Sequence, residues 1–374
     1  LLRTDASVNN ASNVLYSNEE GTSTSLNNNQ EDTVSTPSPT RISVAQFLAE
    51  FPHKFPTAFE REFETCIRQV GGNASASRFS SRINWPKNRY VDVPCLDHSA
   101  VPLPNDAYIH ANFVDGYKRR KAYILTQGEW ILALILCTNK LIDSASWESQ
   151  NPAKTPLYSI ARFVHYFMVA YGQTEQSMDR IVENGRVKCG QYWPPLETNH
   201  GRASSVSTAT KCFPPFSVTN VQQTVEANGL YQLSHLQLSK SQGNGTASES
   251  TNPTTSFAET RKIEHYLFLG WPDFDVPKEP RGFLTFLDVI NERLRQSSTS
   301  LSPSPLIVHC SAGIGRTGTF TAIDICLAQA KAEGYVDVPG VVKRIRQQRA
   351  CSVQLAKQYA FVYQAVYTRL KAIM

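Results

Sequence analysis

The sequence predicts an α/β fold, because short apolar strands are interspersed with amphipathic helices along much of its 374 residues. The clearest unit is an apolar strand at 306–308 followed by a helix at 316–331, with a glycine-containing turn between them. Helical spacing of apolar residues predicts two further helices, at 281–295 and 356–371. With 41% hydrophobic residues, the chain can bury one large core.

The N-terminal part changes character near Ile42. Residues 1–41 are rich in Ser, Thr and Asn and lack periodic apolar residues, so we expect a disordered tail. One catalytic domain is expected over 42–372. At its start, apolar spacing predicts one or two helices, broken near Pro52 and Pro56.

Later stretches predict strands and loops. Apolar and polar residues alternate over 87–127, as in a sheet. Three stretches of low complexity, 195–211, 239–258 and 297–305, are expected to be surface loops, with 239–258 an inserted loop.

Composition narrows the class of protein. The net charge of +5 suits acidic or phosphorylated partners, and no block of basic and aromatic residues indicates nucleic-acid binding. The eight cysteines form no CxxC pair and no zinc-like spacing, so we expect neither disulfides nor a metal. A signal peptide and a run of ~20 apolar residues are both missing, which predicts a cytoplasmic protein without a transmembrane segment.

The turn between the strand and the helix carries the strongest chemical signal. It reads VHCSAGIGRTG over residues 308–318 and places Cys310 where a loop winds into a helix N-terminus. Inward amides and the helix dipole stabilise a thiolate there, and such settings lower a cysteine pKa to roughly 3.5–7.5. Gly313 and Gly315 permit the tight turns that aim these amides at one point.

The same loop can hold a phosphate. Arg316 can donate two hydrogen bonds to phosphate oxygens, and Thr317 can donate its hydroxyl to the thiolate. His309 is expected to bond the loop backbone rather than act as a base. The loop amides that would bind phosphate belong to Ser311, Ala312, Gly313, Ile314 and Gly315. A buried cysteine in a glycine-rich turn is the structural alternative.

This segment resembles the HCSAGxGRTG signature of the cysteine-dependent protein tyrosine phosphatases. The resemblance covers 87–128 and 178–370, about three-quarters of the chain, and the stretches 87–97 and 324–329 are most similar to the non-receptor type nine subfamily. It implies a highly twisted mixed β-sheet flanked by helices, with the phosphate loop between a strand and a helix. It also implies hydrolysis of phosphotyrosine in proteins through a cysteinyl-phosphate intermediate, with no cofactor.

The leaving phenolate needs a proton from an acid on a segment that closes over the substrate. The string WPDFDVP begins at Trp271 and is stiffened by two prolines, and the resemblance makes Asp273 this acid. By itself the string fits a proline-rich turn equally well. For the second step, Gln354 and Gln358 match the family's water-positioning glutamines, although Leu355 replaces the usual threonine.

Pocket depth would select phosphotyrosine over the shorter phosphoserine. By resemblance, Tyr90 stacks on the substrate ring and Asp92 accepts hydrogen bonds from the substrate backbone. Glu183 matches the carboxylate that orients the loop arginine, and Lys188 matches a lysine that lines the pocket. Each could instead be an ordinary core or surface residue.

Residues 129–177 depart from the family, which has a core helix and an inner strand there. We find no match before about Met178, although 158–171 is apolar enough for a substitute helix. A sheet without an inner strand predicts a marginal fold. The alternative function is therefore a catalytically impaired pseudophosphatase that still binds phosphotyrosine. A phosphoinositide or phosphoserine phosphatase is disfavoured by the neutral loop residues.

Overall fold

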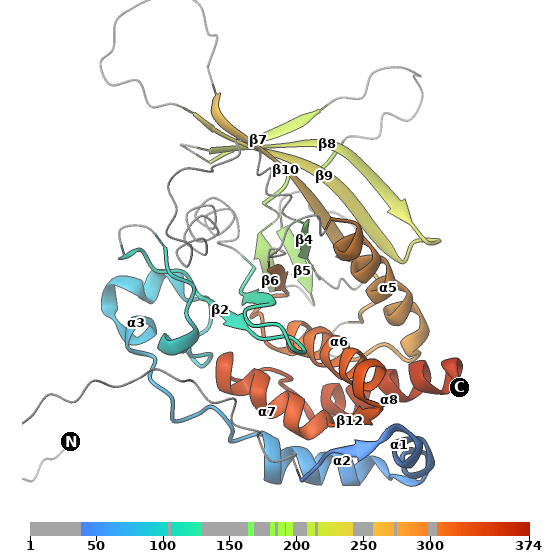
Figure 1. The fold of residues 1–374 in the computed structure, drawn as a ribbon. Coiled ribbons are helices and arrows are strands. Elements are labelled where there is room, and N and C mark those ends of the chain that lie inside the picture. Colours follow the sequence, from blue (N-terminus) through green and yellow to red (C-terminus); the bar gives the residue numbers. More distant parts are fainter. Residues whose placement is uncertain are drawn as a thin grey trace, which may run out of the picture. The chain divides into compact units, whose positions relative to one another are not determined.

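A computed structural model describes most of the C-terminal nine-tenths of the chain (Figure 1). The described residues are 39–103, 106–128, 164–167, 180–183, 186–190, 192–196, 208–213, 216–241, 257–272, 275–297 and 305–374, with side chains placed for most of them. They lie in one compact unit, Ser38–Met374. The expected tail at 1–41 falls almost wholly outside them, and the first strand, β1, begins at Ile42.

The main sheet is mixed and has the strand order β2-β3-β11-β4-β10-β9-β8-β7. Four inner strands run parallel: β3 (Tyr123–Thr126), β11 (Leu306–His309), β4 (Val164–Phe167) and β10 (Phe257–Phe268). The antiparallel strands are β2 (Ala111–Val114), β9 (Tyr231–Ser241), β8 (Phe216–Glu226) and β7 (Ala209–Phe213). Every residue of β3 and β11 is buried, as expected for parallel strands covered on both faces. The α/β fold class with a mixed sheet is therefore confirmed.

Helices supply the rest of the core. The longer ones are α5 (Pro280–Ser297), α6 (Gly315–Glu333), α7 (Val338–Gln348) and α8 (Ala356–Ile373). Short ones near the start are α1 (Val44–Glu50), α2 (Pro56–Glu62) and α3 (Ser77–Ser80), with 3₁₀ helices at Phe51–His53, Arg82–Lys87 and Asp97–Ser99 and a short π-helix at Phe63–Ile67. None of the helices in these ranges is long and apolar enough to cross a bilayer.

Small pairs of strands complete the described structure. β1 (Ile42–Ser43) pairs with β12 (Tyr335–Val336), and β5 (Arg180–Glu183) pairs with β6 (Arg186–Gly190), both antiparallel. The core beneath the site is aromatic: the Trp271 ring packs edge-on against Phe283 and Phe361. These three rings join the segment after β10 to helices α5 and α8.

Three of the four longer helices were predicted from the sequence, and α7 was not. The helices expected at 281–295, 316–331 and 356–371 are confirmed. The observed helices extend beyond these ranges by no more than two residues at either end. The apolar stretch from residue 44 is interrupted at both prolines: Pro52 lies in a 3₁₀ turn and Pro56 opens α2. The strand at 306–308 is confirmed and extends by one residue.

Three expectations about strands and loops are wrong in part. Within 87–127 only β2 and β3 are strands, because loop-fixing side-chain bonds, such as Tyr108 Oη to Asn88 Oδ1 at 2.7 Å, replace the ladder elsewhere. The loop expected at 239–258 is narrower, since β9 continues to Ser241 and β10 begins at Phe257. Likewise β7 includes residues 209–211. Thr suits strands, and polar side chains are tolerated on the exposed face of an antiparallel sheet, so composition alone hid these strand ends.

The most informative correction concerns β4. The stretch 158–171 was judged apolar enough for a substitute helix, but its described part, Val164–Phe167, is a strand between β11 and β10. It pairs in parallel with both neighbours, through Ile307↔His165 on one side and four positions of β10 on the other. The expected gap at an inner position of the sheet is therefore filled.

Candidate active site

The site forms where the parallel strand β11 ends and helix α6 begins. Ligands of α/β sheets bind at such carboxyl ends of strands. Cys310 follows β11 directly and is only 5% exposed. Five residues later the chain enters α6 at Gly315, so the loop lies against the N-terminus of a 19-residue helix.

Five consecutive backbone carbonyls of this loop, from Cys310 to Ile314, accept hydrogen bonds from surrounding side chains and backbone amides. The donors are His309 Nδ1 to Cys310 O (3.0 Å), Gly128 N to Ser311 O (3.1 Å), Arg349 Nη2 to Ala312 O (3.0 Å), Arg349 Nε to Gly313 O (3.1 Å), and the amides of Gly318 and Val353 to Ile314 O (both 3.0 Å). Because peptides are planar, the N–H groups of residues 311–315 lie on the opposite side of each peptide unit. This arrangement is compatible with the predicted ring of amides around one anion.

Close approach to the backbone explains Gly313, and Gly315 lies against two glutamine side chains. A Cβ at Gly313, where φ is +70°, would lie 2.0 Å from the carbonyl oxygen of Thr126. A Cβ at Gly315 would lie 2.9 Å from Gln358 Nε2 and 3.4 Å from Gln354 Oε1. The latter contacts place both predicted glutamines against the loop, while Gln358 Oε1 also accepts the amide of Leu355 at 3.2 Å.

Arg349 is the main support of the loop, because it donates to two successive loop carbonyls. Its guanidinium is fully buried and also donates to Asn112 Oδ1 (2.8 Å) and His110 Nδ1 (3.0 Å). His110 Nε2 donates to Val93 O at 2.8 Å, so this imidazole is neutral with its proton on Nε2. Burial, together with the Arg349 charge, lowers the pKa of His110 to about 3.

A chain of three rings lies behind the nucleophile. His309 Nδ1 donates to the Cys310 carbonyl, so its Nε2 accepts from the Tyr192 hydroxyl at 3.1 Å. That hydroxyl in turn accepts from His265 Nε2 at 2.9 Å. Burial lowers the pKa of His309 to about 3, and its predicted bond to the loop backbone is present. The sequence alone gave no signal for Tyr192 or His265.

The predicted acid loop reaches Arg316 through its backbone. Arg316 Nη2 donates to the carbonyl of Pro272 at 3.3 Å, and the fully buried Trp271 donates from Nε1 to Asp275 O at 2.8 Å. Asp275 Oδ1 pairs with Lys357 at 3.1 Å, and this hydrogen bond lowers the pKa of Asp275. The predicted acid, Asp273, lies outside the described residues.

The Thr317 side chain is fully buried in the first turn of α6. Its hydroxyl has no hydrogen-bond partner among the described residues. A buried hydroxyl is rarely left without a partner, so this atom fits the predicted role of donor to an anion beside it.

Tyr90, from the segment after the 3₁₀ helix Arg82–Lys87, lies against the loop. Its hydroxyl is 2.7 Å from Ser311 Oγ, and the ring is half-buried. Gln127, which the sequence reading did not select, accepts from the amide of Arg89 at 3.0 Å and donates to Lys87 O at 2.6 Å. Gln127 thereby fixes the segment that carries Tyr90. Asp92 is exposed, and no contact joins it to the loop in the described structure.

Two predicted residues are placed only by their backbone. Glu183 is the last residue of β5, opposite Arg186, and Lys188 lies within β6. The positions of both side chains lie outside the description, so their predicted contacts with Arg316 and the pocket remain predictions.

Comparison with known proteins gives the same picture over most of the chain. The profile of the family described as protein-tyrosine phosphatase matches residues 84–130 and 160–368. The match resumes at residue 160, so it includes β4, and the unmatched stretch is shorter than the 129–177 expected from the signature alone.

Individual relatives were also found. Tyrosine-protein phosphatase non-receptor type 9 of Mus musculus is 31% identical over 352 residues, which cover 90% of this chain and 50% of that protein. Receptor-type tyrosine-protein phosphatase F of Rattus norvegicus is 32% identical over 314 residues, or 82% of this chain and 13% of that protein. The chain spans about half the length of the type 9 relatives. The fold, the loop signature and the family profile agree, and the chain belongs to the protein-tyrosine phosphatase family.

Proposed function

We propose that this chain hydrolyses phosphotyrosine in proteins, with Cys310 as the nucleophile. The observation that carries the proposal is the outward bonding of five successive carbonyls, from Cys310 to Ile314, which leaves the opposite side of the loop for an anion. Amides fixed in this way stabilise charge that develops in a transition state without reorganisation.

The reaction has two steps. The Cys310 thiolate attacks phosphorus, the bond to the tyrosyl oxygen breaks, and the phenolate takes a proton from Asp273. Water then attacks the cysteinyl-phosphate, which releases inorganic phosphate and restores the sulfur. Gln354 and Gln358, which lie against Gly315, are suited to position that water.

The remaining residues have supporting roles in this proposal. Arg316 binds two phosphate oxygens, and the hydroxyl of Thr317 stabilises the sulfur as a leaving group in the second step. Tyr90 forms the wall of the pocket, and Asp92 holds the substrate backbone. Glu183 orients Arg316, and Lys188 lines the pocket beside the acid loop.

The test is turnover of a phosphotyrosyl peptide by the expressed chain. Cys310→Ser is expected to abolish phosphate release while it leaves peptide binding intact, and Asp273→Asn is expected to lower kcat about 10²–10⁴-fold. Phosphoserine peptide and an inositol phospholipid, assayed in parallel, are expected to be poor substrates. Equal turnover of phosphoserine would reject the assignment to phosphotyrosine.

A second candidate is a phosphotyrosine-binding module without catalysis, which was suggested by the unmatched segment. Residues 131–159 lie outside the family profile and keep this candidate open. Its main motive, a missing inner strand, is weakened by β4. Tight binding of the peptide by the unmodified chain, with no phosphate released, would favour the module over the enzyme.

The cellular setting is part of the proposal. The similarity to a non-receptor phosphatase supports tyrosine-phosphorylated proteins as partners and a cytoplasmic location. Imaging of the tagged full-length protein in its own cells tests the location directly.

A further inference from the structure

Lys357 joins the start of helix α8 to the acid loop, residues 271–277. Its ammonium nitrogen lies 3.1 Å from Asp275 Oδ1, and the two side chains are 42% and 62% exposed. Neither residue has a part in the two reaction steps proposed above. Lys357 directly precedes Gln358, which lies against Gly315 of the phosphate loop. The ion pair therefore connects the acid loop to the helical turn that carries a glutamine of the second step.

The position of Lys357 is unfavourable for α8 by itself. The first turn of a helix carries partial positive charge, so a cation is disfavoured there and a carboxylate is favoured. The first turn of α8 contains no acidic residue. Asp275 supplies negative charge from outside the helix, so its pairing with Asp275 explains this lysine better than helix formation does.

Contacts hold the acid loop on both sides of the proposed acid. Before the acid, the carbonyl of Pro272 accepts a hydrogen bond from Arg316 Nη2 at 3.3 Å. After the acid, the carbonyl of Asp275 accepts from the Trp271 indole at 2.8 Å. The tryptophan bond lies within the loop and fixes its shape, whereas the bond from Lys357 attaches the loop to another element.

The Asp275 carboxylate is also oriented by its own backbone. Its Oδ1 accepts from the amide of Val276 at 3.0 Å. The hydrogen bond from Lys357 lowers the pKa of Asp275, which keeps this group ionised at neutral pH. A charged acceptor in a fixed position therefore faces the lysine.

The ion pair and the Arg316 contact occur together in one arrangement of the loop. Arg316 is the proposed phosphate ligand, so its bond to the Pro272 carbonyl brings the acid loop against the substrate site. An interaction made in one arrangement raises the population of that arrangement over those that lack the interaction. The pair between Lys357 and Asp275 therefore favours the arrangement in which the loop contacts Arg316.

We propose that Lys357 is a positioning residue: through Asp275 it holds the acid loop against Arg316, so that the proposed acid can protonate the leaving phenolate. This inference rests on the proposed function, because the acid loop has no role without the reaction. Exposed ion pairs contribute little free energy, so the effect on the rate is modest, about fivefold. The effect declines as the salt concentration rises, because ions screen exposed charges.

Two aryl phosphates with different leaving groups test this role in the full chain. Phenyl phosphate releases a phenolate about as basic as that of tyrosine, which needs the acid, whereas dinitrophenyl phosphate releases a weakly basic phenolate, which does not. Lys357→Glu is expected to lower kcat/KM about fivefold for phenyl phosphate and less than about twofold for the dinitrophenyl ester. A weaker attraction of dianionic substrates would lower both values alike, so the difference reports the acid.

Further variants separate the ion pair from the lysine itself. Lys357→Arg keeps the charge and is expected to stay within about twofold of the unmodified chain for both esters. Asp275→Lys is expected to show the same selective loss as Lys357→Glu. The double variant with both changes restores a pair of opposite charges, and it is expected to recover most of the loss for phenyl phosphate.

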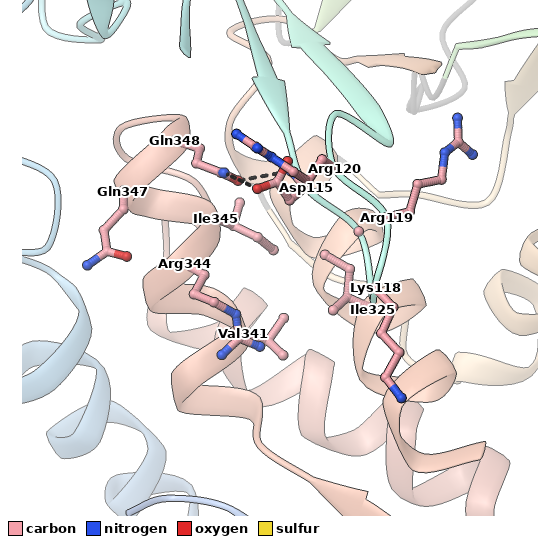
Figure 2. A pocket seen from close by; sticks show the side chains of 11 residues that line it. Asp115, Lys118, Arg119, Arg120, Ile325, Val341, Arg344, Ile345, Gln347 and Gln348 are labelled. Atoms are coloured by element: carbon pink, nitrogen blue, oxygen red, sulfur yellow. Dashed lines mark hydrogen bonds between the residues drawn. The ribbon is translucent and has the colours of Figure 1, made fainter. Parts of the chain in front are cut away.

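Arg344→Glu is the matched control. This cation is 55% exposed and also faces a carboxylate, that of Asp337, at 3.9 Å. Figure 2 shows it on α7, in a pocket that no described residue of the acid loop or of α8 lines. The control is expected to change kcat/KM less than about twofold for either ester. Melting curves check that every variant folds.

The outcomes separate this inference from the proposed function. An unmodified chain that turns over neither a phosphotyrosyl peptide nor the two esters would overturn both. If the unmodified chain is active, an equal loss for the two esters in Lys357→Glu, the same loss in Arg344→Glu, or no recovery in the double variant would overturn the role of Lys357 alone.

Discussion

At the scale of single residues, the loop depends on a side chain that touches no substrate. Arg349 holds the carbonyls of Ala312 and Gly313 with two nitrogens of one rigid fork. A lysine has one nitrogen on a flexible stem and cannot hold both carbonyls at once. Orientation of the loop amides therefore depends on the guanidinium shape as much as on its charge.

Arg349→Lys is expected to lower kcat for a phosphotyrosyl peptide about 10²-fold, because amides that rotate out of line no longer stabilise the transition state. Arg346→Lys is the matched control. Arg346 is also buried and bonds backbone carbonyls, those of Arg68, Ser352 and Val353 among them, but none in the phosphate loop. Both variants lose stability, so kcat is measured per folded molecule, and equal losses of kcat would contradict the assigned role.

Tyr192 supports a prediction about stability. Tyr192→Phe leaves Nε2 of His309 without its donor and Nε2 of His265 without its acceptor, both in a fully buried site. Two lost buried partners are expected to lower the free energy of unfolding by about 1–3 kcal/mol in urea titration. Tyr335→Phe removes the hydroxyl of a residue that is 41% exposed. This variant should change the free energy of unfolding by less than about 0.5 kcal/mol. A similar value for both variants would argue against the ring chain.

At the scale of elements, helices defined by local sequence were predicted, whereas a strand defined by distant partners was not. The helices at 280–297 and 356–373 were predictable because 3.6-residue periodicity is a local property of the sequence. The helix at 315–333 was also predicted, although it is buried on nearly all sides, and α7 was missed. β4 was not predictable, because four residues carry too little periodicity and the strand is defined by its partners β11 and β10. The ends of β7, β9 and β10 were missed because polar strand residues look like loop residues.

The inner position of β4 leads to a backbone test. Each residue of an inner strand donates its N–H to a neighbour on one side or the other, so proline anywhere in β4 removes a ladder bond. Tyr166→Pro is expected to destabilise the chain by about 3 kcal/mol or more, observed as a large drop in Tm. Tyr166→Val keeps the N–H and suits a strand, so it separates the backbone effect from loss of the side chain. Equal melting of the two variants would show that β4 does not pair as an inner strand.

At the scale of the whole molecule, the residues proposed to react were easier to select from the sequence than the residues that support them. Cys310, Arg316 and the two glutamines are set by a short motif and by short-range spacing, and the fold brings the glutamines against the loop. Arg349, His110 and Tyr192 act through contacts across long separations, such as the 239 positions between Arg349 and His110. No periodicity in a single sequence encodes such pairs, so only the folded chain identifies them.

The buried histidines also make stability depend on pH across the whole molecule. His110 and His309 have a folded pKa of about 3, lowered by burial, against about 6.5 in an unfolded chain. Between these values the unfolded chain binds more protons, so the free energy of unfolding falls as the pH falls below about 6.5 and levels off near 3. From pH 7 to pH 5 the two groups together contribute a loss of roughly 4 kcal/mol, if both remain neutral in the fold.

Urea titrations at pH 7 and pH 5 measure this loss. His110→Gln is expected to lower stability at pH 7, where Arg349 loses a partner, but to remove about half of the pH-dependent loss, because glutamine binds no proton in either state. His53→Gln is the control, because it removes an imidazole from an exposed position. It shows whether the effect comes from loss of a buried histidine or from loss of any histidine. A pH-dependent loss that is the same for the His110→Gln chain and the unmodified chain would show that His110 takes up its proton without unfolding. Its bond from Arg349 would then be broken at mildly acid pH, and the phosphate loop would lose part of its support while the fold persists.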